Sequence, residues 1–295
     1  MSNFSFLDKN LLRTRALRAA HLRTQEGDNA ASVDFLLRWA EKEMIERLND
    51  IRHEIKQCAV LSPAPSQEFL DYLLSRGIKF EIFADLYLSD DEILPLERNR
   101  FDAVISFFEL HKINDLPGWL VQIRSTLKED GVLIACLAGE ATLFQLRQSL
   151  LAAEMNILGG ASPRVMPFIS KQQMAGLLQR AGFTLPVVDS ETVTATYESI
   201  FTLMKDLRLM GETNAMIEKY KSFSPPGLFI ETSKIYAERF AEENGRLPAT
   251  FDVTFLIGWS PSDTQQKPLR RGSGQVNLAD FLASDTQSGA NQEKE

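Results

Sequence analysis

The chain has 295 residues, of which 44% are hydrophobic, and its formal net charge is −8. This length and apolar fraction allow one large core or two modest ones, so a globular enzyme or assembly protein is the default class. The acidic balance argues against a broad nucleic-acid interface, because binding to phosphates needs clustered Lys and Arg.

The N-terminal stretch is basic, with four arginines between residues 13 and 23. Such a stretch is compatible with a mitochondrial presequence, although Asp8 argues against one because presequences are poor in acidic residues. No run reaches the roughly 18 apolar residues that a membrane span needs, so we expect no span. Cys58 and Cys136 lie in apolar runs, which predicts two buried thiols rather than a disulfide or a metal site.

The first predicted elements are a helix, a strand and a second helix. Residues 31–55 place apolar side chains at helical spacing with charges between them, which predicts an amphipathic N-terminal helix. The run Cys58–Leu61 is short, apolar and followed by prolines, as expected of a buried strand that meets a loop. Ser66 then suits the N-cap of a compact helix and Gly77 its C′ position.

Two strands, a helix and a further strand follow. Residues 79–88 and 100–110 are rich in β-branched and aromatic residues, and a polar turn separates them. The apolar positions of residues 116–131 recur at helical spacing, and the apolar run 132–138 follows at once. This succession has the spacing of a strand–helix–strand unit.

The second half continues the alternation. Helices are predicted over 141–156, 169–183, 198–210 and 231–245, and strands over 186–197 and 249–259. Alternating strands and helices predict an open, mostly parallel sheet wrapped by helices. We expect four strands to lie side by side in parallel: 58–61, 80–86, 101–107 and 132–138.

The predicted organisation has three parts. An N-terminal helical segment covers residues 1–55, and one α/β domain covers 56–260 with a helical insertion at about 197–245. Residues 261–295 have the polar composition of a disordered tail.

The acidic turn Ser89–Leu96 is a candidate ligand contact, because the ligand crevice of an open α/β sheet lies beyond the strand ends. A carboxylate there can accept hydrogen bonds from an adenine amino group or a ribose hydroxyl. The apolar Ile93 and Leu94 can wall a base. A solvated acidic loop explains the same residues.

His111 follows a buried strand directly. Glu109 and His111 are therefore candidates for proton transfer or substrate orientation, since histidine titrates near neutral pH. The alternative is a histidine that only packs and hydrogen-bonds at a strand-to-helix turn, with Asn114 or Asp115 capping the next helix.

Arg164 is a candidate for binding an acidic group. Arg164 lies in a loop preceded by glycines, where it can grip a carboxylate, and Arg270 and Arg271 form a small basic pair. An exposed linker and solvated surface charges explain these residues equally well.

The loop after the first strand, Leu61–Ser66, contains no glycine. A nucleotide cofactor in this fold normally needs glycines there, so that backbone N–H groups can approach it. Pro63 and Pro65 also remove two donors and fix φ. We therefore expect the crevice beside Ser62 to be smaller than a nucleotide requires.

Several stretches together resemble the class I S-adenosyl-L-methionine-dependent methyltransferases. They include SDDEILPL, HKINDLP, SPRVMPF, MGETNA and ATFDVTFLIGW, and with their flanks they cover most of residues 89–273. The subgroup that the chain resembles is the respiratory complex I assembly factor 5 group with its bacterial relatives. That subgroup is also similar to the malonyl-carrier-protein methyltransferases of biotin synthesis.

The resemblance implies a Rossmann-like methyltransferase sheet of seven strands and S-adenosyl-L-methionine as the cofactor. Asp90 would correspond to the adenine-contacting acid, and the acid that holds the ribose hydroxyls is either absent or replaced by Asp85. The candidate cofactor-binding residues are Ser62, Asp85, Asp90, Asp91 and Ile93, and the candidate catalytic residues are Glu109 and His111.

The implied activity is modification of a protein side chain, which in the complex I group is arginine hydroxylation rather than methylation. A respiratory complex I subunit is the implied partner, and the compartment is the bacterial cytoplasm or, alternatively, the mitochondrial matrix. The cofactor half is short by about one strand–helix unit. Together with the glycine-free loop, this favours the alternative of a non-catalytic scaffold, so catalytic competence is left open.

Overall fold

The computed structural model describes residues 5–26, 34–84, 86, 89 and 91–266. One compact unit extends to Ser262, and a second begins at Asp263. The predicted tail, including its basic pair, therefore lies almost wholly outside the described residues. In chain order the elements are α1 (Lys9–Glu26), α3 (Phe35–Asp50), β1 (Gln57–Leu61), α4 (Gln67–Ser75), β2 (Lys79–Phe83), β3 (Phe101–Phe107), η3 (Leu110–Lys112), α5 (Leu116–Thr126), β4 (Leu127–Ala138), α6 (Phe144–Leu158), α7 (Lys171–Arg180), β5 (Thr184–Tyr197), α8 (Ile200–Leu209), α9 (Pro226–Phe240) and β6 (Leu247–Trp259).

The strands of the described residues form one six-stranded sheet in the order β2-β1-β3-β4-β6-β5. β1 pairs in parallel with β2 and β3, and β3 pairs in parallel with β4, whereas β6 runs antiparallel to β4 and β5. The predicted set of four adjacent parallel strands is confirmed, although β2 ends at Phe83. The described sheet has one strand fewer than the resemblance implies, in agreement with the short interval between β1 and β3.

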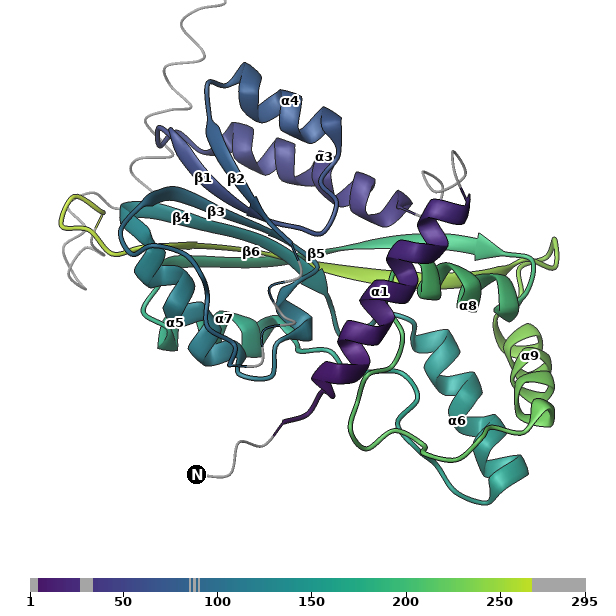
Figure 1. Ribbon diagram of the computed structural model, residues 1–295. Helices are drawn as coiled ribbons and strands as arrows, with labels where there is room; N and C mark the ends of the chain where they lie inside the picture. Colours follow the sequence, from purple (N-terminus) through teal and green to yellow (C-terminus); the bar gives the residue numbers. More distant parts are fainter. Residues whose placement is uncertain (1–4, 27–33, 85, 87–88, 90, 267–295) are drawn as a thin grey trace, which may run out of the picture. The chain divides into compact units, whose positions relative to one another are not determined.

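Helices cover both faces of the parallel part of the sheet, because successive side chains of a strand point to opposite sides. In β1, Ala59 and Leu61 share a core cluster with residues of α5 and α7. Cys58 and Val60 share another cluster with residues of α3 and α4. Figure 1 shows these two helix pairs on opposite faces, which is why β3 is buried along its whole length.

A third apolar cluster forms where the long strands β5 and β6 meet α6, α8 and α9. It contains Phe251 of β6, Leu203 of α8 and Tyr236 of α9. The ring of Tyr236 is fully buried, and its hydroxyl donates a hydrogen bond to the Pro248 carbonyl at 2.7 Å. The second half of the chain therefore builds its own core beyond the parallel strands.

Several helices begin or end at the capping residues that the sequence predicts. Ser66 Oγ accepts the N–H of Phe69 at 3.0 Å at the start of α4. Asp115 caps α5 by accepting the N–H of Gly118 at 3.0 Å. Gly77, one residue beyond the C-cap of α4, has a φ of +72°, a backbone conformation that a residue with a Cβ rarely adopts.

The helix predicted from residue 116 to just before Gly131 is too long. It ends at Thr126, and Leu127 already begins β4, where it pairs with Phe101 of β3. Leu127 is buried there, and the chain bends through Asp130 at a φ of 59° before regular pairing resumes. Burial of Leu127 beside the sheet thus overrides the local helical pattern.

Cys58 and Cys136 are fully buried free thiols, as predicted. Burial raises the pKa of each thiol to about 12. In the described part of the chain, no helix is long and apolar enough to cross a membrane. The same residues contain no group of three or more His, Cys, Asp or Glu side chains able to hold a metal ion.

Candidate functional site

A cavity of about 540 Å³ opens at the carboxyl ends of β3 and β4. Phe107 and Phe108 line it from the end of β3, Ala138 from the end of β4, and Pro63 from the loop after β1. Small-molecule sites typically measure about 300–1,000 Å³. The prediction that the strand-end pocket is too small for a nucleotide is therefore wrong.

His111, Lys112 and Glu212 form a charged cluster in the cavity wall. His111 and Lys112 belong to η3, just beyond β3, and Glu212 lies in the turn after α8. His111 Nε2 lies 3.1 Å from one carboxylate oxygen of Glu212, and Lys112 Nζ lies 2.8 Å from the other. The rings of Phe108 and Phe168 contact the His111 ring at centroid distances of 6.4 and 5.8 Å, so its position is well defined.

The Glu212 carboxylate stays charged at neutral pH. Burial opposes its charge, but Lys112 and His111 outweigh burial and lower its pKa to about 2. An anionic carboxylate at Nε2 favours the tautomer of His111 that carries its proton there. Nδ1 then holds the free lone pair of the ring, and it has no hydrogen-bond partner among the described residues. The arrangement can accept a proton at Nδ1 while Glu212 supports the resulting positive charge.

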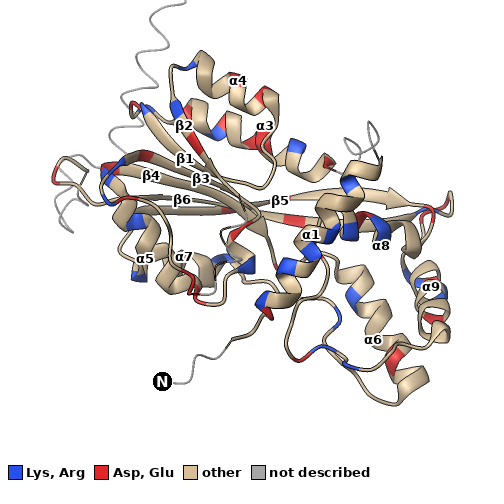
Figure 2. Cartoon of the chain, viewed as in Figure 1, with Lys and Arg blue, Asp and Glu red and all other residues tan. Residues whose placement is uncertain are grey.

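Basic side chains dominate the charged part of the cavity wall. Among the described lining residues, seven are basic (Arg15, Arg18, Arg23, Lys112, Arg164, Arg208 and Lys219) and three are acidic (Asp34, Glu212 and Asp252). Positive charges therefore exceed negative ones by four at the wall, in a chain whose net charge is −8. α1 supplies three of the seven, and Figure 2 shows Lys and Arg distributed along this helix.

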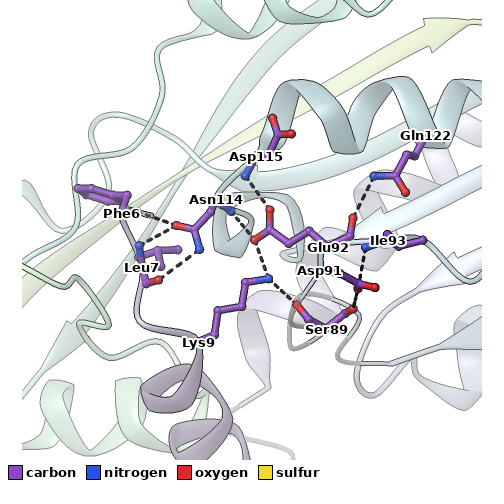
Figure 3. Close-up of polar contacts among 10 residues, drawn as sticks. All are labelled: Phe6, Leu7, Lys9, Ser89, Asp91, Glu92, Ile93, Asn114, Asp115 and Gln122. Atoms are coloured by element: carbon purple, nitrogen blue, oxygen red, sulfur yellow. Dashed lines mark hydrogen bonds and ion pairs between the residues drawn. The ribbon is translucent and has the colours of Figure 1, made fainter. Parts of the chain in front are cut away.

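The segment before α1, a helix that lines the cavity, is attached to two distant turns, and Figure 3 shows its attachment to Asn114. Asn114 Oδ1 accepts the backbone N–H groups of Phe6 and Leu7 at 2.8 and 2.7 Å. The N–H of Asp8 donates to the Ala215 carbonyl at 2.8 Å. Residues that are about one hundred positions or more apart in sequence thus hold one wall of the cavity in place.

Glu92 ties the acidic turn to the same region (Figure 3). Its carboxylate accepts the N–H groups of Asn114 and Asp115 at 2.9 and 2.7 Å and pairs with Lys9 Nζ at 2.7 Å. Burial opposes the charge of Glu92, but the ion pair and the two N–H donors still lower its pKa. Gln122 also donates to its backbone carbonyl at 2.9 Å. This residue of the acidic turn is therefore a buried structural acid.

The loop after β1, Ser62–Ser66, already uses most of its backbone donors. The N–H of Ser62 donates to the Phe83 carbonyl at 3.1 Å, and the N–H of Ser66 donates to the Glu41 carboxylate at 2.7 Å. The two prolines of the loop have no N–H. Within this loop, only Ala64 has a backbone N–H that is neither missing nor bonded in this way. The loop therefore cannot surround a ligand with backbone donors.

The two predicted catalytic residues occupy different environments. His111 lines the cavity. Glu109 is 1% exposed at the N-terminus of η3 and is not among the described residues that line the cavity. The structure therefore brings one of the pair to the cavity, and the catalytic role of both stays a prediction.

The predicted cofactor-binding residues do not line this cavity where they are described. Ser62 is fully buried, and Asp91 and Ile93 are exposed, with the Asp91 carboxylate accepting the N–H of Ile93 at 3.2 Å. Asp85 and Asp90 lie outside the described residues. Contacts of these five residues with a cofactor stay predictions.

Sequence reasoning missed the cavity role of α1 and of Glu212. In the sequence, the α1 arginines suggest only a mitochondrial presequence, against which Asp8 argues. Glu212 is 101 positions from His111, although it lies in the MGETNA stretch that supported the resemblance. Arg164, a candidate for binding a carboxylate, does line the cavity, but it already pairs with Glu154 at 2.6 Å.

Comparison with known proteins matches residues 17–186 to a family described as a methyltransferase domain. The zebrafish protein named arginine-hydroxylase NDUFAF5, mitochondrial, is 40% identical over 201 residues, which are 68% of this chain and 62% of that protein. The chain thus spans about three fifths of the length of this relative.

A malonyl-[acyl-carrier protein] O-methyltransferase from Laribacter hongkongensis is 29% identical over 269 residues, covering 86% of this chain and 88% of that protein. Among solved structures, that of a candidate methyltransferase from Bacillus halodurans covers 75% of this chain and 98% of that chain, with 12% identity and a TM-score of 0.48. A likeness at that level adds nothing to the fold described above.

Proposed function

Since this chain belongs to the methyltransferase domain family, we propose that it modifies an arginine side chain of a protein partner in the cavity beyond β3 and β4. One observation carries the proposal. The HKINDLP and MGETNA stretches, which support the resemblance to the arginine-hydroxylase group, meet in the cavity wall through the 3.1 Å contact between His111 and Glu212. The name of the zebrafish relative supports arginine as the target.

His111 is the proton-accepting group of this proposal. The charged Glu212 carboxylate fixes its Nε2, which leaves Nδ1 to take a proton from the substrate side chain. A guanidinium group is a weak acid, so removal of its proton needs a positioned base with a negative group behind it. Glu212 supplies that negative charge, and Lys112 holds the carboxylate in place.

The cofactor of the family, S-adenosyl-L-methionine, does not fit the usual cradle here. The loop Ser62–Ser66 directs its donors to Phe83 and Glu41 rather than toward a ligand. We therefore derive no step of the reaction through it, and binding of the cofactor needs a direct measurement.

The proposed partner is a respiratory complex I subunit. The proposed compartment is the mitochondrial matrix or the bacterial cytoplasm. The zebrafish relative is mitochondrial by name, which supports the first, and the Laribacter relative comes from a bacterium, which supports the second.

The test uses cells from which the gene for this chain has been deleted. Complex I is purified after re-expression of the wild type, His111→Ala or the matched control His21→Ala, whose side chain is exposed on α1. We expect the wild type and the control to restore an arginine with one added oxygen atom, supplied by molecular oxygen with a cellular reductant and measured by mass spectrometry, and His111→Ala to restore none. An added methylene group would identify methylation instead.

The glycine-free loop favours a second candidate, a scaffold without catalysis. In that case His111→Ala would restore the amount of assembled complex I, and neither the wild type nor the variant would change the mass of any arginine. Calorimetry with S-adenosyl-L-methionine on the same purified proteins would show whether the cofactor binds at all.

A further inference from the structure

Most of the acidic charge in the cavity wall is already neutralised. Glu212 is paired with Lys112 at 2.8 Å. Asp34, at the start of α3, lies 3.9 Å from Arg23 and 3.8 Å from Arg38. The negative groups of the wall therefore do not balance its remaining cations.

Four basic residues of the wall have no ion pair with a described residue. They are Arg15 and Arg18 of α1, Arg208 of α8, and Lys219. Their charges face a common cavity that opens within an acidic protein. Such a group of cations has an electrostatic preference for a negative ligand.

Arg15 bears the clearest sign of a missing partner. Its Nη1 atom is buried and makes no hydrogen bond to any described residue. Burial lowers the pKa of its guanidinium group, the neighbouring Arg18 lowers it further, and Asp8 only partly opposes these effects. A buried donor on a charged group costs free energy when it is unsatisfied, so a ligand that satisfies it gains a charge-assisted hydrogen bond.

Arg164 shows the same feature on another wall segment. Its Nε binds Glu154 at 2.6 Å and its Nη1 binds Ser224 at 2.8 Å, but its buried Nη2 has no partner among the described residues. The guanidinium carbon lies 5.0 Å from the ring centroid of Tyr220. Two arginines from distant parts of the chain thus each retain a buried donor at the same cavity.

The rest of the wall is apolar. Leu143, just before α6, Leu146 of α6 and the rings of Phe107, Phe108 and Phe168 contribute to it. A volume of about 540 Å³ accommodates a small organic molecule rather than a single ion. The wall therefore combines cationic donors with an apolar surface.

We propose that this cavity binds a small organic acid with an apolar body, whose carboxylate or phosphate group is held by Arg15 with Arg18 and Arg208. The proposal rests on the cations of the cavity wall and on the buried donor of Arg15. It does not depend on arginine being the substrate. A bound anion would also offset the positive surplus of the wall.

Calorimetry on the full chain tests the proposal with three probes that share one apolar body: octanoate, octyl phosphate and octylamine, all below their micelle concentrations. We expect at least one anion to bind and octylamine not to bind. Stronger binding of octanoate or of octyl phosphate identifies the acidic group that the site prefers. Equal binding of octylamine, or no binding of either anion, overturns the proposal.

The variant Arg15→Gln tests whether Arg15 is part of the anion-binding site. We expect this variant to weaken anion binding by about tenfold or more, the effect of losing a hydrogen bond to a charged group. The matched control is Arg180→Gln on α7, an exposed arginine outside the cavity wall, and it should bind as the wild type does. Unchanged binding by Arg15→Gln contradicts the assignment.

A second readout separates ligand binding from a structural role of Arg15. Without ligand, Arg15→Gln should unfold at the same temperature as the wild type or a higher one, because it removes a buried donor that lacks a partner. A lower unfolding temperature without ligand would mean that Arg15 serves the fold, and would overturn the proposal.

Discussion

Two neighbouring regions at the same end of the sheet differ in whether their hydrogen-bond donors have partners within the fold. In the loop after β1, the backbone N–H of Ser62 donates to the Phe83 carbonyl at the end of β2, and that of Ser66 donates to the Glu41 carboxylate. Beyond β3 and β4, buried donors of Arg15 and Arg164 are left without a partner around an open cavity. The first region therefore uses two backbone donors within the fold, whereas the second keeps unpaired charged donors beside a cavity.

This difference shows that the site of this chain cannot be inferred from the position of the usual cofactor loop. The loop Ser62–Ser66 occupies that position, yet its donors are used internally. Binding capacity instead resides where α1 and the turn after α8 cover the ends of β3 and β4. The following changes test the comparison, from the largest expected effect to the smallest.

Glu92→Ala should produce the largest effect, because Glu92 joins the start of α1 to the turn before α5. The variant leaves the N–H groups of Asn114 and Asp115 without their acceptor and removes the ion pair of Lys9, which keeps only the Ser89 carbonyl as an acceptor. We expect a loss of about 3 kcal/mol in the free energy of unfolding, measured by urea denaturation. The exposed Glu97→Ala should leave it unchanged. A loss below about 1 kcal/mol would show that the α1 wall is held by other contacts.

Glu212→Gln should change how the free energy of unfolding depends on pH in the acidic range. The pKa of Glu212 in the folded protein is about 2, below its ordinary value of 4.5. Its contribution to stability is therefore fully present above pH 4.5 and is lost as the pH falls from 4.5 toward 2. We expect the variant to lack a stabilisation of about 2 kcal/mol at pH 6 and to differ less from the wild type at pH 2.5. Parallel urea titrations at the two pH values measure this, and an unchanged difference would contradict it.

Ser66→Ala probes the closed region. The variant loses the hydroxyl that caps α4 by accepting the N–H of Phe69. We expect a loss of about 1 kcal/mol in unfolding free energy and no change in binding of the anionic probes. Ser75→Ala, at the other end of α4, is the control for a surface hydroxyl. Weaker anion binding by Ser66→Ala would mean that the two regions are coupled.

Asp91→Ala should have the smallest effect. Its carboxylate is exposed and makes only local hydrogen bonds in the acidic turn. The midpoint of thermal unfolding should not change. Any weakening of S-adenosyl-L-methionine binding in calorimetry could then be assigned to a lost contact with the cofactor, and unchanged affinity would remove Asp91 from the predicted site.

The parallel core was predictable because its signal is local. Runs such as Phe101–Phe107 are apolar at every position, as strands covered on both faces must be. The end of α5 was not predictable, since the choice of Leu127 between helix and strand depends on its contact with Phe101. Local pattern thus gave the elements, and tertiary packing decided where one of them ends.

The cavity was predictable only in part. His111 follows a buried strand, and this position brings it to the strand ends in any parallel sheet. Its partner Glu212 and the α1 arginines come from opposite ends of the chain, and no spacing rule joins them. The buried role of Glu92 was likewise hidden, because its hydrogen-bond donors, the backbone N–H groups of Asn114 and Asp115, leave no signal in the side-chain pattern.

The two buried thiols allow the opening of each region to be measured separately. Cys58 lies in β1, beside the closed loop, and Cys136 lies in β4, which leads to the cavity. A thiol whose pKa is about 12 and which is shut off from solvent reacts with an alkylating reagent only when its strand opens. The rates at which the two cysteines are labelled therefore report opening on either side of β3 separately, in one experiment and without any substitution.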